Sequence, residues 1–147
     1  MNALTTVAQY IDNENDVRRC YAVMAQLRPH LASEDDFVAR WRRQATDGYR
    51  LLALLDGLHV VALAGFRVQE NLVHGRFLYV DDLVTDERLR SGGHGERLMA
   101  RLKQEAHVLG CGKLVLDTPL SNSLGHRFYF RNGLLASALR FSIAITQ

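Results

Sequence analysis

A glycine-rich hexapeptide at positions 90–95, Arg-Ser-Gly-Gly-His-Gly, is the stretch of this chain that most directly suggests chemistry. It lies between an apolar, strand-like run, Arg76–Val84, and an amphipathic run that begins near Glu96. Glycine permits positive φ angles and lets backbone N–H groups approach a ligand, and the start of a following helix adds a partial positive charge. The layout therefore predicts a loop that binds phosphate groups, with a diphosphate as the natural guest.

Two common nucleotide-binding motifs do not fit this loop. A P-loop ends in Gly-Lys-Ser or Gly-Lys-Thr, whereas this loop continues as Gly95-Glu96-Arg97. The dinucleotide-binding motif needs a third glycine at a position where this chain has none. On the loop residues alone, a plain strand-to-helix turn is the alternative to a phosphate site.

A second motif lies at positions 122–133, where Asn-Ser-Leu-Gly-His-Arg-Phe-Tyr-Phe-Arg-Asn-Gly predicts a short helix ended by glycine. Together with the glycine loop, this segment resembles the GNAT superfamily of acetyl-CoA-dependent N-acetyltransferases. Members of that superfamily carry Arg/Gln-x-x-Gly-x-Gly/Ala after the fourth strand and Asn-x-x-Ala-x-x-Phe-Tyr-x-x-x-Gly-Phe after the fifth. The matching residues are Arg90, Gly93, Gly95, Asn122, Phe128, Tyr129 and Gly133. Gly125 and Leu134 depart from the pattern at packing positions.

The resemblance implies acetyl-CoA as cosubstrate, with its diphosphate in the glycine loop. It also implies that the main chain of residues 83–85 pairs with the pantetheine arm like an added strand. The residues expected to bind the cofactor are therefore Leu83, Val84, Thr85, Arg90, Ser91, Gly92, Gly93, His94, Gly95, Glu96 and Asn122. For His94, the backbone N–H is expected to matter more than the ring.

Acetyl transfer from a thioester to an amine requires a neutral amine. An alkylamine with a pKa near 10.4 is neutral only about one part in a thousand at pH 7, so a nearby carboxylate that takes its proton assists the reaction. Asp81 and Asp82 end a strand at a position where some polyamine acetyltransferases of the superfamily carry an acidic pair. Because side chains alternate along a strand, we expect only one of them in the substrate cleft. Asp81 is favoured since it shares the face of Tyr79, where the resemblance implies that related enzymes place their base. A solvated or ion-paired carboxylate is the alternative.

The departing thiolate also needs a proton, and Tyr129 is the expected donor. The resemblance assigns this role to it, and a phenol has a pKa just above that of a thiol. The alternative is a core aromatic beside Phe128 and Phe130. The histidines show no metal-ligand spacing, so no metal is predicted.

Size and composition fit one domain over residues 1–147, since 147 residues that are 48% hydrophobic can bury a core. A net charge of +2 does not call for a nucleic-acid partner. The two cysteines, Cys20 and Cys111, show no paired spacing, so no disulfide is predicted. The longest apolar run, Leu58–Phe66, is too short to span a bilayer and the N-terminus does not read as a leader peptide, so a cytoplasmic protein without a membrane partner is expected.

The predicted elements support an α+β fold, an α/β sandwich. Strands are expected at Val7–Ile11, Tyr49–Leu55, His59–Val68, Arg76–Val84, Lys113–Asp117 and Ala138–Ile145, and helices from Asp16 to Pro29, from Ser33 to Gly48, from Glu96 to Leu109 and from Asn122 to Arg131. The resemblance adds a mixed sheet whose fourth and fifth strands start parallel and splay apart around the pantetheine arm.

The predicted function is the transfer of an acetyl group from acetyl-CoA to a primary amine by direct attack in a ternary complex. The acidic pair, together with residues 34–36, Glu-Asp-Asp, favours a cationic small molecule such as a polyamine or an aminoglycoside. A protein lysine or N-terminal amine is the alternative acceptor, and an acyl-CoA-binding regulatory module without turnover is the alternative from another class. A homodimer is compatible with the sequence.

Overall fold

The computed structural model describes residues 5–146. The chain divides into two compact units, residues 1–116 and 117–147, and each is described by itself. In the described part of the first unit, five strands form one sheet in the order β1-β2-β3-β4-β5. The strands are β1 (Val7–Ile11), β2 (Arg50–Asp56), β3 (His59–Asn71), β4 (Gly75–Thr85) and β5 (Lys113–Leu116). Neighbouring strands are antiparallel except β4 and β5, which are parallel, so the predicted mixed sheet and α+β class are confirmed.

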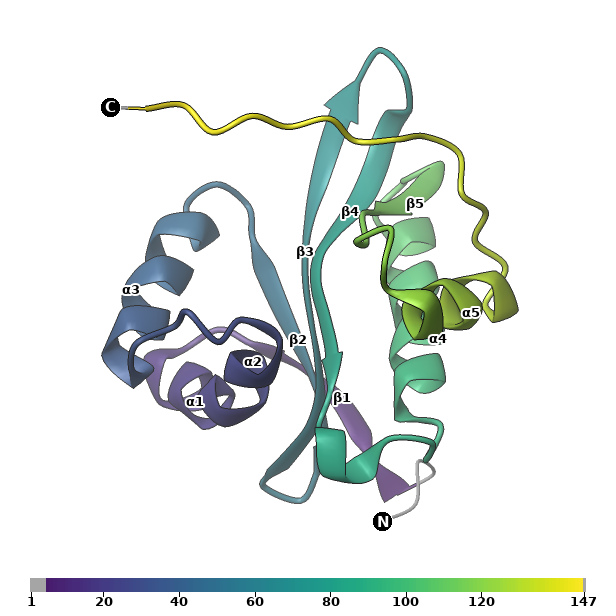
Figure 1. Ribbon diagram of the computed structural model, residues 1–147. Coiled ribbons are helices and arrows are strands. Elements are labelled where there is room, and N and C mark those ends of the chain that lie inside the picture. The colour runs from purple at the N-terminus through teal and green to yellow at the C-terminus, as the bar shows by residue number, and fades with distance from the viewer. Residues whose placement is uncertain (1–4, 147) are drawn as a thin grey trace. The chain divides into compact units, whose positions relative to one another are not determined.

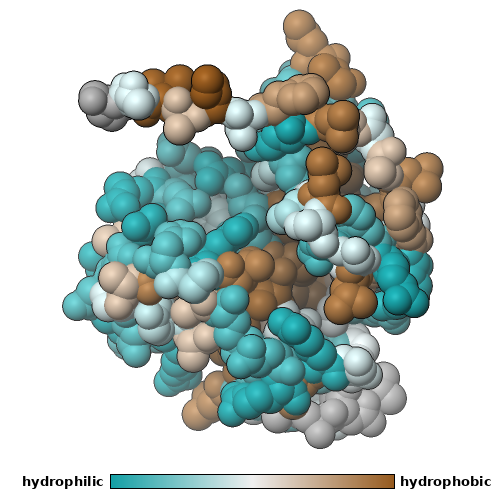
Figure 2. Space-filling view, viewed as in Figure 1, coloured by the Kyte–Doolittle hydropathy of each residue, from teal (hydrophilic) through white to brown (hydrophobic). Residues whose placement is uncertain are grey.

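Helices cover both faces of this sheet. They are α1 (Glu14–Arg19), α2 (Tyr21–Leu27), α3 (Glu34–Ala45) and α4 (His94–Val108), with a short 3₁₀ turn, η2 (Glu87–Leu89), before α4. Figure 1 shows α1–α3 on one face and α4 on the other. Figure 2 shows that the outer surface of the α1–α3 layer is largely hydrophilic, as expected of helices that bury one side only.

The inner strand β2 is apolar from Leu51 to Leu55, because it packs against a core on each face of the sheet. Leu51 and Ala53 pack in the core with α1–α3, whereas Leu52 and Leu54 pack in the core with α4. Successive side chains of a strand point to opposite faces, and here both faces are covered. The strand therefore has no polar face.

A β-bulge interrupts the pairing of β3 with β4. Gly65 pairs with Asp82 and the next residue, Phe66, pairs with Val80, so Asp81 has no partner in the register. An extra residue of this kind shifts the alternation of side chains by one position. Asp81 and Asp82 consequently point to the same face of the sheet.

The parallel pairing of β4 with β5 is short. It covers Phe77–Val80 on β4, where β5 ends, while β4 continues along β3 to Thr85. Within residues 5–146, no strand pairs with this last part of β4 on the β5 side. This main-chain edge is where the resemblance expects the two strands to separate.

The helices before β2 differ in detail from the prediction. Asn13, rather than Asp16, caps α1, since its Oδ1 accepts a hydrogen bond from the Asp16 backbone N–H at 2.9 Å. The helix does not run on to Pro29, because a tightened turn at Cys20 separates α1 from α2. The start of α3 is as predicted, with Ser33 Oγ accepting from the Asp36 N–H at 3.1 Å.

The second unit contains α5 (Ser123–Arg131), which ends at Gly133 with a φ of 90°. The predicted strand Ala138–Ile145 is wrong, since the described residues after α5 form no helix or strand. The alternation of apolar side chains there is typical of a strand, but a strand also needs a neighbour for its backbone hydrogen bonds, and no described strand pairs with it. The exposed large hydrophobic residues of this segment are Leu135, Leu139, Phe141, Ile143 and Ile145. Figure 2 shows hydrophobic surface along the C-terminal tail.

Candidate active site

A pocket of ≈ 280 Å³ lies between α2, α3 and the acidic end of β4. Both Asp81 and Asp82 line it. The strict alternation on which the expectation of a single cleft-facing carboxylate rested does not hold, because the bulge at Asp81 shifts it by one position. The apolar part of the lining is formed by Met24, Leu31, Phe37 and Trp41.

Asp82 is held by two donors. Its Oδ1 accepts from Arg28 Nε at 2.9 Å, and its Oδ2 accepts from the Tyr49 hydroxyl at 2.7 Å. Burial raises the pKa of Tyr49 well above its usual value, and the Asp82 carboxylate raises it further, so the phenol stays a donor. Each oxygen of Asp82 thus has a partner, as in a carboxylate that organises a site.

The carboxylate of Asp81 accepts fewer hydrogen bonds than that of Asp82. Its Oδ2 accepts from Arg67 Nε at 3.2 Å, and Arg67 also donates to Gln44 Oε1 at 3.0 Å. Burial raises the pKa of Asp81 above its usual value; the Arg67 guanidinium opposes this rise and the Asp82 carboxylate adds to it. A carboxylate with a raised pKa binds a proton more strongly, so the surroundings of Asp81 fit a proton acceptor.

The position of Tyr49 depends on a glycine in the middle of β3. A Cβ at Gly65 would overlap the Tyr49 hydroxyl and ring. The sequence analysis missed Arg28, Tyr49, Gly65 and Arg67. For Gly65 there was a signal, because a glycine inside an apolar strand often marks a close approach by another group. The other three carry no distinctive pattern.

The predicted pantetheine segment lies just beyond the acidic pair. Leu83, Val84 and Thr85 pair with β3, and their other edge faces the gap left where β5 ends. An extended ligand could add to this edge by main-chain hydrogen bonds, as strands do. The geometry therefore fits the role that the resemblance implies for these three residues.

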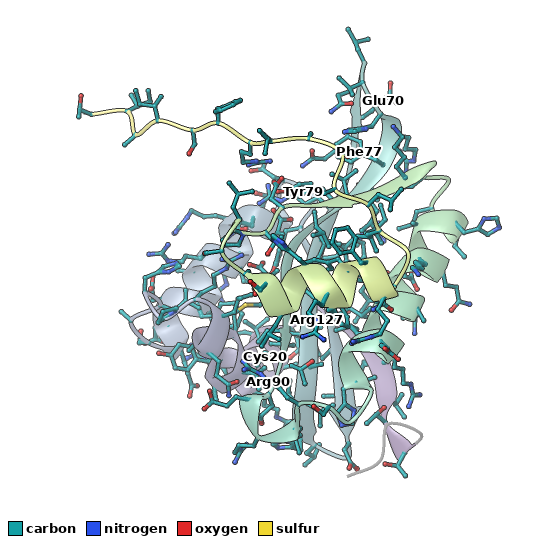
Figure 3. All side chains as sticks on the ribbon, turned by 45° about the vertical axis from the view of Figure 1, so that its right-hand side comes forward. Cys20, Glu70, Phe77, Tyr79, Arg90 and Arg127 are labelled. Carbon is teal, nitrogen blue, oxygen red and sulfur yellow. The ribbon has the colours of Figure 1, made fainter. Side chains whose placement is uncertain are left out.

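The glycine loop leads into α4 with an unusual backbone. Ser91 has a φ of 70° and Gly93, the residue before the helix, a φ of 81°. Gly93, the N-cap residue, provides no side-chain cap for α4. In Figure 3, Arg90 lies toward the opposite end of β4 from Phe77, at the end where β4 leaves its pairing with β5. Gly95 and Glu96 lie in the first turn of α4, which begins at His94, two residues earlier than predicted. Exposed N–H groups at a helix start fit a phosphate group.

The His94 ring is buried beneath this loop, with 2% of the residue exposed. Within residues 5–146, its Nδ1 has no hydrogen-bond partner. A Cβ at Gly92 would lie 3.0 Å from His94 Nε2, a tight contact, so a glycine at this position lets the loop lie close to the ring. The ring, which the sequence analysis set aside, therefore supports the loop from below.

Asp86 anchors the chain between β4 and the loop. Its buried carboxylate accepts from Arg88 Nη2 at 2.8 Å and from Gln26 Nε2 at 3.3 Å, while Gln26 Oε1 accepts from the Glu87 N–H at 2.9 Å. The Arg88 guanidinium holds the pKa of Asp86 far below its usual range. This anchor connects α2, which carries part of the pocket, to the start of the loop.

The second unit carries the remaining predicted site residues. Tyr129 is partly buried on α5, and this burial raises the pKa of its hydroxyl above the usual value. The hydroxyl is therefore protonated at neutral pH, as a proton donor must be. Asn122 caps α5: its Oδ1 accepts from the Gly125 N–H at 3.1 Å, and its Nδ2 donates to Thr118 Oγ1 at 3.0 Å. A Cβ at Gly125 would overlap the Asn122 side chain, which accounts for glycine at this position.

Residues 5–146 contain neither a cluster of metal ligands nor a membrane-spanning helix. No three His, Cys, Asp or Glu side chains of residues 5–146 gather as a metal site would require. None of the helices in this part of the chain is long and apolar enough to cross a bilayer.

Comparison with known proteins relates this geometry to a family. The model of the Acetyltransferase (GNAT) family matches residues 12–134. An uncharacterized N-acetyltransferase of Bacillus subtilis, YhdJ, is 30% identical over 109 residues, which are 74% of this chain and 77% of that protein. The aminoalkylphosphonate N-acetyltransferase of Salmonella typhimurium is 33% identical over 98 residues, 66% of this chain and 62% of that protein, so the match spans less than two thirds of that relative.

A solved structure shares the fold at low identity. The aminoglycoside N-acetyltransferase AAC(6')-Iy in complex with CoA matches with a TM-score of 0.83 and 14% identity, over 95% of this chain and 94% of the other. At that identity the likeness concerns the fold alone.

Proposed function

Since the chain belongs to the GNAT family of N-acetyltransferases, we propose that it transfers an acetyl group from acetyl-CoA to the primary amine of a small molecule bound beside Asp81 and Asp82. The observation that carries this proposal is the bulge in β4, which places both carboxylates in the wall of one pocket. A carboxylate pair attracts an ammonium ion, the main form of an alkylamine at neutral pH.

The chain's own residues would act in three ways. Asp81, with its raised pKa, takes a proton from the ammonium ion directly or through water. Asp82 holds Arg28 and Tyr49 in position by hydrogen bonds. The edge of β4 at residues 83–85 and the N–H groups at the start of α4 bind the cosubstrate. Acetyl-CoA supplies an activated acetyl thioester.

The transfer balances as follows. The neutral amine nitrogen bonds to the acetyl carbon, and the bond from that carbon to sulfur breaks. The sulfur leaves with the electron pair of the broken bond and takes a proton from Tyr129, whose raised pKa keeps its hydroxyl protonated until then. The nitrogen, which carries an extra proton after the attack, releases it to water, and Tyr129 regains a proton from water. The products are an N-acetyl amine and a free thiol.

The family match spans both units, which supports one catalytic domain over residues 1–147.

The identity of the amine stays a prediction. A polyamine or an aminoglycoside-like molecule is the choice made from the sequence. The name of the Salmonella relative adds an aminoalkylphosphonate to the candidates. A protein lysine or N-terminus is the enzyme alternative, but a pocket of ≈ 280 Å³ favours a compact molecule.

The test is to incubate the protein with acetyl-CoA and a panel of these amines, including a lysine peptide, and to measure the release of free thiol. We expect turnover with a small amine and its loss in Asp81→Asn. Greatest turnover with the peptide would favour the alternative acceptor. Binding of acetyl-CoA without turnover on any amine would instead indicate a regulatory module.

A further inference from the structure

Resting on the proposed function, the pocket narrows the class of acceptor. We propose that the acceptor carries an oxyanion, a carboxylate or a phosphonate, a few atoms from its amine, and that Arg28 and Arg40 bind this group. Both arginines line the same pocket as Asp81 and Asp82. The pocket therefore presents cations and carboxylates to one ligand, which suits a zwitterion.

Arg28 is held in place by hydrogen bonds that leave some of its N–H donors unused. Its Nε donates to Asp82 Oδ1 at 2.9 Å, and its Nη2 donates to the Asp81 carbonyl oxygen at 2.8 Å. A guanidinium has five N–H donors, and these hydrogen bonds use two of them. The side chain is 41% exposed, so the remaining donors are open to a ligand.

Arg40 approaches the pocket from α3. Its Nε donates to Asp36 Oδ1 at 3.0 Å, which anchors the guanidinium from behind. Both terminal nitrogens of Arg40 lack a partner within residues 5–146, and the side chain is 43% exposed. Terminal guanidinium nitrogens are the fork that binds a carboxylate or phosphonate in a bidentate manner.

Charge and size together disfavour a polycation. A second ammonium group in this pocket would meet Arg28 and Arg40, and like charges at short range repel. The pocket has a volume of ≈ 280 Å³, so a compact acceptor can place both of its charged ends against the same lining. Trp41 and Phe37 line the same pocket and can contact a short carbon chain between the two groups.

The experiment compares four amines with the same carbon spacing: 3-aminopropylphosphonate, 4-aminobutanoate, butylamine and 1,4-diaminobutane. The readout is kcat/KM from thiol release with saturating acetyl-CoA. We expect at least one oxyanion-bearing amine to exceed butylamine and the diamine by about 10- to 100-fold, the effect of hydrogen bonds to a charged group. The ratio of the phosphonate to the carboxylate tells which oxyanion the fork prefers.

Arg40→Gln should remove this preference, mainly by raising the KM of the oxyanion-bearing amines. Arg28→Gln should do the same with an added loss on all amines, because Arg28 also holds Asp82. The matched control is Arg43→Gln, which makes the same change of charge on an exposed position of α3 outside the pocket and should preserve the preference.

The experiment distinguishes a failure of this inference from a failure of the proposed function. Equal kcat/KM values for butylamine and the oxyanion-bearing amines would overturn the inference while leaving the proposed function in place. If no amine is acetylated, the proposed function fails, and calorimetric binding of 3-aminopropylphosphonate decides the inference. Binding that weakens by about tenfold or more in Arg40→Gln, but not in Arg43→Gln, supports the anion site. Binding that is absent or equal in the two variants overturns it.

Discussion

Replacing Asp81 by Asn tests the base. The change keeps the shape of the side chain but removes its ability to take a proton, so an amine must reach the site already neutral. With an amine pKa near 10.4, the neutral fraction is about 1 in 2,500 at pH 7 and about 0.3 at pH 10. We expect the variant to lose about 10²- to 10⁴-fold in kcat at pH 7 and to regain up to ~700-fold between pH 7 and pH 10.

The sign of the wild-type profile follows from the raised pKa of Asp81. The base works only when ionised, so activity should fall as the pH drops through that pKa, at a higher pH than an ordinary aspartate would give. Asp82→Asn is the comparison, because Asp82 is tied to Arg28 and Tyr49. It should alter KM and stability without the recovery at high pH.

The assay is thiol release from pH 6 to 10 with the best amine of the panel. If Asp81→Asn and Asp82→Asn both run parallel to wild type across this range, neither carboxylate is the base. A recovery at high pH in Asp82→Asn alone would show that Asp82 is the base. It would refute the assignment of Asp81 as the base and of Asp82 as a residue that is held by Arg28 and Tyr49.

Three further variants test the rest of the site. Tyr129→Phe should lower kcat by about 10²- to 10⁴-fold with little change in acetyl-CoA affinity; wild-type turnover would leave Tyr129 only a packing role. Acetyl-CoA at 100 times its Kd should stabilise the native state by about 2.7 kcal/mol and so raise the melting temperature. Gly93→Val should abolish this rise, whereas Gly75→Val, also at positive φ, should retain it. Gly65→Ala should lower the unfolding free energy by about 1–3 kcal/mol and reduce activity by displacing Tyr49, while Gly112→Ala, which has open space, should do neither.

Local sequence patterns were enough to predict most elements and the family. Glycines before an amphipathic run predict the loop before α4, and Ser33 with Asp36 predicts the start of α3. These features depend on residues close together in the chain, because caps, turns and helical periodicity involve near neighbours. The same holds for the motif around Tyr129, whose helix is where the sequence places it.

Contacts between distant segments decided the pocket. The bulge at Asp81 depends on the register of β4 against β3, and no residue of β4 by itself announces it. Two arginines that contact Asp81 come from distant parts of the chain: Arg28 lies 53 positions before it and Arg67, on β3, lies 14 positions before it. Arg40 lines the pocket only because α3 packs over the sheet. The sequence by itself determined that this chain carries acetyl-transfer motifs on an α+β frame. The placement of the two carboxylates and the charges around the pocket follow from tertiary packing, because pairing register and electrostatic environment are properties of segments brought together by the fold.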